Sequence, residues 1–223
     1  TGRVSTFTWL SGARALLEIA RIGWYEGPAF RNALWSRSTL LLVRRLLLAL
    51  VLTFAGLSQA WANPMLLVDR ATLQVLYAEE AGQPWHPASL TKLMTAYVTF
   101  EELAKGTVTL DTPVTISRNA YNQAPSKSGL KIDSTVSLKD ALYILVVKSA
   151  NDIAVAIAET VGGSESNFVA MMNETAGRMG MTATNFVNPH GLHDPRQVSS
   201  ARDMAIIALY IEQSFPQYMP MFR

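Results

Sequence analysis

The apolar residues that follow position 62 change their spacing along the chain, and each spacing predicts a different element. Two apolar runs between residues 65 and 78 flank a short polar turn, which is typical of a β-hairpin. In residues 107–117, apolar side chains alternate with threonine around Pro113, which predicts a short, interrupted strand. This part of the chain is therefore expected to contribute to an antiparallel sheet.

Helical spacing begins at Ser89. From Ser89 to Lys105 apolar residues recur every three or four positions, the period of one helix face, and Gly106 ends the pattern. The polar stretches 118–134 and 185–195 contain proline and glycine and are expected to be irregular. The same apolar period, with serines placed to cap three of the segments, predicts further helices at residues 138–146, 153–161, 165–179 and 201–211.

This order of a hairpin, a long helix, an irregular β segment and a run of helices predicts an α+β fold. The hairpin would form one edge of an antiparallel sheet. Because a two-stranded sheet is only marginally stable alone, the sheet needs more strands. The sequence ends at Arg223 without supplying them, so we expect it to be truncated before the later strands.

Residues 39–62 have the pattern of a secretory signal peptide. Arg44 and Arg45 form a positive end, residues 46–55 form a short apolar run, and Ala60-Trp61-Ala62 is a small-x-small cleavage site. An apolar run of this length is too short to cross a membrane. The alternative, an uncleaved anchor that includes residues 40–43, would bury the two arginines in lipid. We therefore expect an exported protein.

Residues 1–38 do not fit a leader of this kind. No methionine occurs before Met65, and signal peptides do not usually carry some forty residues ahead of their positive end. We interpret residues 1–38 as upstream or artefactual sequence. The predicted organisation is therefore segment 1–38, signal peptide 39–62 and one partial catalytic domain at 63–223.

The net charge of the chain is +2, but the charge is unevenly distributed. Residues 1–62 carry a net charge of +5, whereas residues 63–223 carry −3. The basic balance therefore belongs to the leader, and we expect no nucleic-acid partner. The chain has no cysteine, so an exported domain must take its stability from its core rather than from disulfides.

Candidate chemistry begins with Ser89 and Lys92. On a helix, residues three apart lie one turn apart on the same side, and Ser89 would stand at the N-terminus, where negative charge is favoured. A serine needs a base to become a nucleophile, and a lysine can be that base only if its pKa is lowered. The alternative is an ordinary helix start with a surface lysine.

Ser149-Ala150-Asn151 lies between two predicted helices, sixty positions after Ser89. A polar triplet at such a junction can direct a hydroxyl and an amide into a cleft. The alternative is a helix stop and restart, in which Ser149 and Asn151 only cap free backbone groups.

Taken together, the two motifs resemble those of the penicillin-recognising serine enzymes, which share Ser-x-x-Lys followed by Ser-x-Asn. The wider sequence over residues 63–215 resembles the D-alanyl-D-alanine carboxypeptidases of the low-molecular-mass penicillin-binding protein type. The resemblance implies a β-lactamase/transpeptidase-like fold, with an antiparallel sheet flanked by helices and a helical subdomain. The segments that carry it are 87–95, 148–152, 188–192 and 199–204.

The resemblance also implies roles for single residues. Ser89 would be the acyl-enzyme nucleophile, with its backbone N–H as half of an oxyanion hole, and Lys92 its general base. Ser149 would relay a proton to the departing D-alanine, and Asn151 would hydrogen-bond the peptide. We expect no cofactor and no metal: His190 and His193 have a spacing that suits a metal, but no third ligand accompanies them.

The expected substrate is a peptidoglycan stem peptide ending in D-Ala-D-Ala, and the expected inhibitors are β-lactams. The family's third motif, Lys-Thr-Gly, does not occur before Arg223, so we expect the 63–223 fragment to be inactive by itself. The implied location is the periplasm, with inner-membrane association through a C-terminal tail that is not in this sequence. The alternatives are a truncated inactive product and a serine β-lactamase, which residues 181–200 disfavour because they contain no glutamate.

Overall fold

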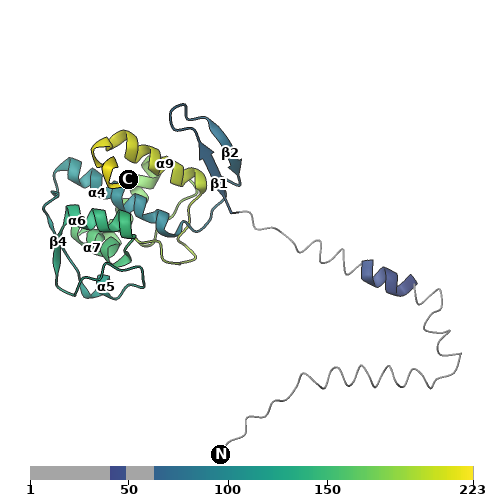
Figure 1. Cartoon of the computed structure of the whole chain (residues 1–223), viewed down its shortest axis with the longest axis horizontal. Coiled ribbons are helices and arrows are strands. Elements are labelled where there is room, and N and C mark those ends of the chain that lie inside the picture. Colours follow the sequence, from purple (N-terminus) through teal and green to yellow (C-terminus); the bar gives the residue numbers. More distant parts are fainter. Residues whose placement is uncertain (1–40, 49–62, 223) are drawn as a thin grey trace, which may run out of the picture. The chain divides into compact units, whose positions relative to one another are not determined.

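A computed structural model describes residues 41–48 and 63–222 of the chain (Figure 1). The chain divides into two units, Thr1–Trp61 and Ala62–Arg223. In the first unit, residues 41–48 form an exposed helical segment. The predicted segment 1–38, the end of the apolar run and the cleavage site lie outside the described residues. No helix in the described ranges is long and apolar enough to span a bilayer.

The second unit begins with the predicted hairpin. Strand β1 (Met65–Val68) pairs antiparallel with β2 (Val75–Glu79), with Met65 opposite Glu79. The Asp69 carboxylate closes the turn by accepting hydrogen bonds from the N–H groups of Ala71 and Thr72. All five residues of β2 are exposed.

The long helix starts two residues later than the spacing predicts. Ala88–Leu90 form a 3₁₀ turn, η1, and helix α4 runs from Thr91 to Lys105. Leu90 has φ −61° and ψ −22°, and its N–H bonds the carbonyl three residues back, as in a 3₁₀ turn, so Ser89 lies in the turn and not in the helix. At the other end Gly106 adopts φ 75° and caps α4, as predicted.

A second antiparallel pair joins β3 (Pro113–Thr115) to β4 (Thr135–Ser137). The alternation over 107–117 therefore yields only three strand residues, and Pro113 takes the first of them, where the missing N–H is tolerated. The sequence did not predict β4 or the short helix α5 (Arg118–Tyr121). Both are too short for a period to be recognised.

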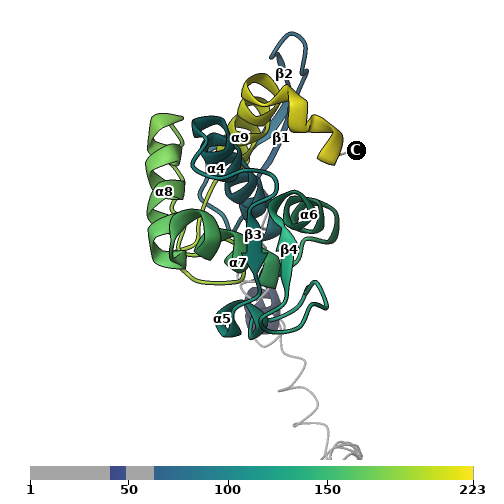
Figure 2. The same ribbon diagram turned by 90° about the vertical axis from the view of Figure 1, so that its left-hand side faces the viewer.

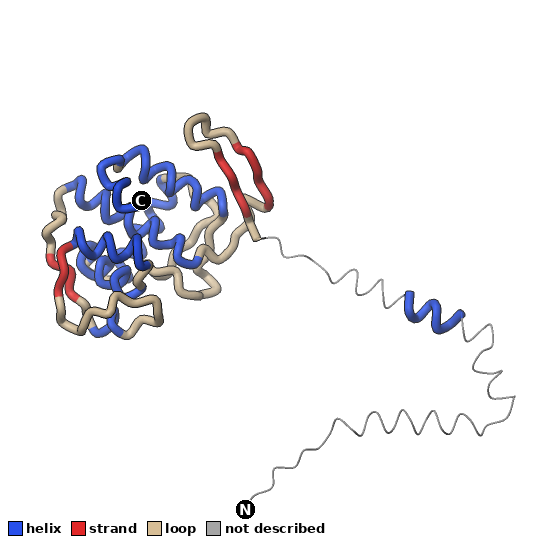
Figure 3. Tube along the Cα trace, in the orientation of Figure 1, coloured by secondary structure: helices blue, strands red, loops and turns tan. Residues whose placement is uncertain are grey.

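The remaining helices follow the predicted order. Figure 3 shows in blue that helices make up most of the regular structure of this unit. Three predicted caps are confirmed: the hydroxyls of Ser137, Ser164 and Ser200 each accept the backbone N–H three residues on. The elements are α6 (Leu138–Tyr143), a π-helical turn η2 (Ile144–Lys148), α7 (Asn151–Gly162), α8 (Glu165–Arg178), α9 (Ala201–Ser214) and a 3₁₀ segment η3 (Pro216–Phe222).

Helix α7 lies at the centre of this unit. Its residues from Asn151 to Ala158 are all buried, and it packs against α4, α5 and α8. Figure 2 shows α8 on one side of α4, with α6 and the β3–β4 pair on the other. Phe100 of α4 anchors an aromatic cluster with Phe215, directly after α9, and with residues of η3, including a stacked contact with Tyr218. The unit is α+β, as the sequence predicts, and its core fixes α4 against α7.

Candidate active site

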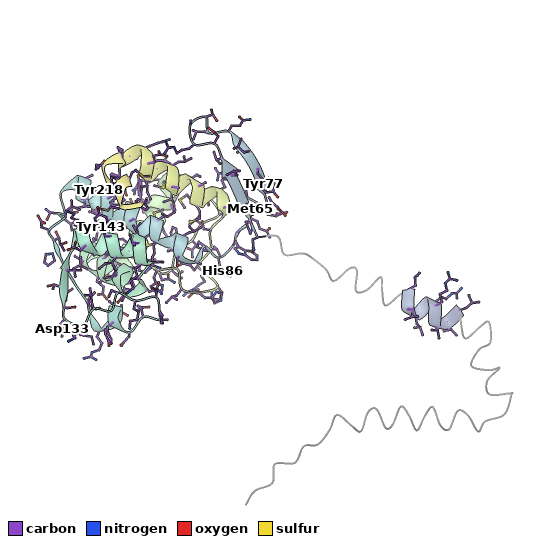
Figure 4. All side chains as sticks on the ribbon, viewed as in Figure 1. Met65, Tyr77, His86, Asp133, Tyr143 and Tyr218 are labelled. Carbon is purple, nitrogen blue, oxygen red and sulfur yellow. The ribbon has the colours of Figure 1, made fainter. Side chains whose placement is uncertain are left out.

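A cavity of about 340 Å³ collects the predicted site residues from two separate stretches of the chain. Ser89, Ser149 and Asn151 all line it, and Lys92 is linked to it through Asn151. His86, which is labelled in Figure 4, also belongs to the lining. The other lining residues are Ala88, Pro125, Ser126, His190, Gly191, Leu192, His193 and Gln197.

A larger hollow of about 780 Å³ lies elsewhere, between α5, the start of α8 and the Phe186 segment. None of the four predicted site residues lines it. The larger hollow therefore lacks the predicted site residues, and we take the smaller cavity as the candidate active site.

Ser89 is exposed in the 3₁₀ turn directly before α4. The turn is closed by a hydrogen bond from the Leu90 N–H to the Pro87 carbonyl. Within residues 41–48 and 63–222, the Ser89 hydroxyl makes no hydrogen bond, so it is available to a ligand in the cavity. The turn holds this hydroxyl beside the first free N–H groups of α4, where negative charge is stabilised.

Lys92 is 5% exposed, in the first turn of α4. Its Nζ donates to Asn151 Oδ1 at 2.7 Å and to the His190 carbonyl at 2.7 Å. Both acceptors are uncharged, and no carboxylate of the described residues forms an ion pair with it. Burial therefore lowers the pKa of Lys92 from 10.5 to about 8. Lys92 therefore has the lowered pKa that a lysine needs in order to act as a base.

Asn151 is the residue that connects the two motifs. Its Oδ1 accepts from Lys92, and its Nδ2 donates to the Ala124 carbonyl at 3.0 Å. Its backbone N–H donates to the Ser126 carbonyl at 2.7 Å. The sequence led us to expect a contact between Asn151 and the substrate and did not reveal that this amide holds the lysine.

Ser149 follows the π-helical turn and has a left-handed φ of 56°. The N-cap of α7 is Ala150, which makes no side-chain cap. Ser149 therefore caps the π-helical turn through its backbone, as the alternative expects, but its side chain and that of Asn151 do not cap the start of α7. The described part of the chain offers the Ser149 hydroxyl no hydrogen-bond partner, and this hydroxyl lines the cavity.

Asp152 is a site residue that the sequence analysis missed. It is fully buried, and its two oxygens accept the backbone N–H of Ser128, while Oδ2 also accepts the Ser128 hydroxyl. It thereby fixes the loop that contains Pro125 and Ser126, one wall of the cavity. The sequence could have indicated Asp152 as a site residue because it directly follows Asn151.

The opposite wall is the Asn188–Leu192 loop. Asn188 Oδ1 accepts the N–H of Gly191, and its Nδ2 donates to the Leu192 carbonyl. Thr95 of α4 donates to the Pro189 carbonyl at 2.6 Å. The loop is therefore held in shape by its own side chains and by α4. In this shape its His190 carbonyl faces Lys92.

His190 is buried, and its Nδ1 accepts the Leu192 N–H at 3.0 Å. Burial, together with the charge of Lys92, lowers the pKa of His190 to about 4, so the imidazole is neutral at pH 7. The ring of His193 packs edge-on against His86, with centroids 4.8 Å apart. The described residues contain no group of three or more His, Cys, Asp or Glu side chains that could hold a metal.

Gly191 brings the loop into contact with the turn that carries Ser89. Its φ is 87°, and a Cβ at this position would lie 1.8 Å from the Ala88 carbonyl oxygen. Only glycine fits so close an approach to the turn that carries Ser89.

Residues 53–223 match the protein-family model described as D-alanyl-D-alanine carboxypeptidase. The chain is 40% identical over 162 residues to the D-alanyl-D-alanine carboxypeptidase DacA of Haemophilus influenzae, covering 71% of this chain and 41% of that protein. It is 36% identical over 167 residues to the D-alanyl-D-alanine carboxypeptidase DacD of Escherichia coli, covering 72% and 43%.

Solved structures show the same similarity. The D-alanyl-D-alanine carboxypeptidase DacD of Francisella tularensis superimposes with a TM-score of 0.70 at 34% identity, covering 74% of this chain and 40% of that one. Penicillin binding protein 5 of Haemophilus influenzae gives 0.69 at 39% identity, covering 72% and 47%. The chain therefore has the fold of these proteins and spans less than half of their length.

Proposed function

The chain belongs to the D-alanyl-D-alanine carboxypeptidase family of serine peptidases, and on this premise we propose that it supplies the nucleophile and the general base for that activity. The reaction would remove the terminal D-alanine from a peptidoglycan stem peptide through an acyl-enzyme on Ser89. The observation that carries the proposal is Lys92, buried beside the Ser89 cavity with two neutral oxygens as its only hydrogen-bond acceptors in the described ranges.

In the first step, neutral Lys92 takes the proton of the Ser89 hydroxyl, and Ser89 Oγ attacks the carbonyl carbon of the penultimate D-alanine. The Ser89 N–H would stabilise the negative oxygen that forms. When the C–N bond breaks, the proton passes from Lys92 through the Ser149 hydroxyl to the nitrogen of the departing D-alanine. Asn151 would hold Lys92 and hydrogen-bond the peptide.

In the second step, water gives a proton to Lys92 and attacks the ester carbon. The C–O bond to Ser89 breaks, and the proton returns to Ser89 Oγ. The products are D-alanine and the peptide shortened by one residue. A β-lactam would be attacked in the same way, but its leaving nitrogen stays tethered to the acyl group. The acyl-enzyme then persists, and the protein would be covalently inhibited.

The location is part of the proposal. Residues 39–62 would direct export and be removed, residues 1–38 would be upstream sequence, and 63–223 would belong to a catalytic domain in the periplasm. Attachment to the inner membrane through a C-terminal tail is inferred from the family resemblance alone. N-terminal sequencing of the exported protein tests this organisation, and a mature N-terminus at Thr1 would contradict it.

The activity is tested with Ser89→Ala in the full-length protein. We expect this variant to lose both labelling by a fluorescent penicillin and release of D-alanine from a D-Ala-D-Ala peptide. Ser166→Ala, an exposed serine in the first turn of α8, is the matched control and should behave as wild type. Labelling of Ser89→Ala at the wild-type rate would refute the assignment.

A further inference from the structure

Gln197 is a buried side chain that the mechanism above does not use. It is 1% exposed, and its Nε2 donates to Thr91 Oγ1 at 3.0 Å and to the Asn188 carbonyl at 3.3 Å. Its Oε1 accepts the backbone N–H groups of Val187 at 2.6 Å and Asn188 at 3.1 Å. An amide side chain has two donors and two lone pairs, so all four are occupied.

The backbone of Gln197 adds a third connection. Its carbonyl lies 2.9 Å from His86 Nδ1, and because a carbonyl can only accept, the imidazole donates. One residue therefore joins the Asn188 loop to two positions more than a hundred residues earlier in the chain: His86, before the turn that carries Ser89, and Thr91, the first residue of α4. Although Gln197 borders the cavity, its side chain has no donor or acceptor left for a substrate.

Two of these connections lead to the reacting groups. Thr91 stands between Ser89 and Lys92 in the chain, at the start of α4. Asn188 shapes the loop whose His190 carbonyl accepts from Lys92 Nζ. Gln197 thus joins the element that carries Ser89 and Lys92 to the element that supplies one of the two acceptors of Lys92.

We propose that Gln197 is a positioning residue, which sets the distance between the first turn of α4 and the Asn188–Gly191 loop and so aligns Lys92 with Ser89. This role rests on the proposed function. It predicts that breaking the Gln197–Thr91 bond slows acylation beyond any effect on stability, because a misplacement of about 1 Å can reduce a rate on the order of 100-fold.

The test uses the acylation rate of the full-length protein by a fluorescent penicillin, together with its melting temperature. Thr91→Val keeps the shape of the side chain and removes the bond to Gln197, whereas Thr91→Ser keeps the hydroxyl. Thr99→Val is the matched control: it is equally buried, two turns further along α4, and its hydroxyl bonds only the Thr95 carbonyl. Gln197→Met removes all four side-chain hydrogen bonds.

We expect Thr91→Val to acylate about 10-fold more slowly and Gln197→Met about 100-fold more slowly. Thr91→Ser should restore the wild-type rate. Thr99→Val should lower the melting temperature as much as Thr91→Val does, with a wild-type rate. The double variant Thr91→Val, Gln197→Met should be no slower than Gln197→Met alone, because the two changes break one connection.

A wild-type rate in Thr91→Val, or losses that multiply in the double variant, would overturn the role of Gln197 while leaving the proposed function intact. If Gln197→Met does not fold, the comparison of Thr91→Val with Thr91→Ser and Thr99→Val still decides. Failure of the wild-type protein to label at all would overturn the proposed function, and the role of Gln197 with it.

Discussion

At the scale of single residues, the chemistry depends on how Lys92 is solvated. Its Nζ has lost water and gained two neutral acceptors, Asn151 Oδ1 and the His190 carbonyl. Desolvation disfavours the charged form, and with a pKa of about 8 roughly a tenth of the molecules carry a neutral lysine at pH 7. If the lysine were exposed, far fewer molecules would carry it in the neutral form at pH 7.

We therefore predict that acylation of Ser89 becomes faster with rising pH and reaches half of its plateau near pH 8. The sign follows from the base: below its pKa Lys92 is protonated and cannot accept the serine proton. Stopped-flow labelling with a fluorescent penicillin between pH 6 and 10 measures the profile.

Lys92→Arg should lower the acylation rate by about 10²-fold or more, because arginine stays protonated. Lys139→Arg, at an exposed lysine, serves as the control and should acylate at the wild-type rate.

Asn151→Asp extends this prediction. The substitution places a carboxylate where Oδ1 now accepts from Lys92 at 2.7 Å. An opposite charge at this distance favours the ammonium form, so the rise in acylation should move upward by about one to three pH units. A profile that coincides with that of the wild type would show that Lys92 is not the group that titrates.

Ser149 supports a second prediction. Its hydroxyl bonds no described residue, so Ser149→Ala should leave the melting temperature nearly unchanged while lowering D-alanine release about 10²- to 10⁴-fold. Ser149→Gly should lose the same activity. Because glycine adopts the φ of 56° without strain, it should also raise stability by about 1 kcal/mol. Normal turnover in both variants would exclude Ser149 from the reaction.

At the scale of elements, the site is formed where two tight turns contact each other. The turn at Ala88 and the loop at Gly191 approach so closely that no side chain fits between them. The start of α4 is thus fixed from outside the helix as well as by its own hydrogen bonds. The position of Ser89 therefore depends on Gly191, about a hundred residues further along the chain.

Gly191→Ala should therefore reduce both stability and acylation. The new Cβ must displace the Ala88 backbone, and we expect a loss of about 1–3 kcal/mol of stability together with at least about 10-fold slower acylation. Gly106→Ala is the matched control: its φ of 75° is equally unfavourable for alanine, but a Cβ there meets nothing within 4 Å. Gly106→Ala should lower the stability without slowing acylation. Equal acylation by the two variants would contradict the account.

At the scale of the whole molecule, the buried imidazole of His190 couples the stability of the 62–223 unit to pH. Its pKa is about 4 in the folded state and near 6.5 in the unfolded state. Between these values the unfolded chain binds the additional proton. Stability from this group is therefore present above pH 6.5 and is lost as the pH falls toward 4.

We predict that His190→Gln removes this dependence. Glutamine can still accept the Leu192 N–H but does not titrate. The free energy of unfolding of wild type minus that of the variant should fall by up to about 3 kcal/mol from pH 7 to pH 4. Urea unfolding at the two pH values measures this difference, in which the titration of the carboxylates cancels. A difference that does not change with pH would contradict the prediction.

The sequence by itself determined the elements whose signals are local. The hairpin follows from two apolar runs around a polar turn, the long helix from a period of 3.6 residues, and the caps at Ser137, Ser164 and Ser200 from bonds that reach three positions. The elements β4 and α5 were not predicted, because three or four residues are too few to show a period. The α+β class and the family motifs could also be predicted, because they depend on residues that are close together in the chain.

Only the tertiary structure decided how the candidate site is assembled. Lys92 meets Asn151 across 59 positions and His190 across 98, and Thr91 meets Gln197 across 106. The burial of Lys92, and with it the lowered pKa, exists only after α4 packs against α7 and the Asn188 loop closes over it. A local pattern can place a serine and a lysine one turn apart. It cannot show which distant atoms replace the water around the amine, and that replacement lowers the pKa of the lysine.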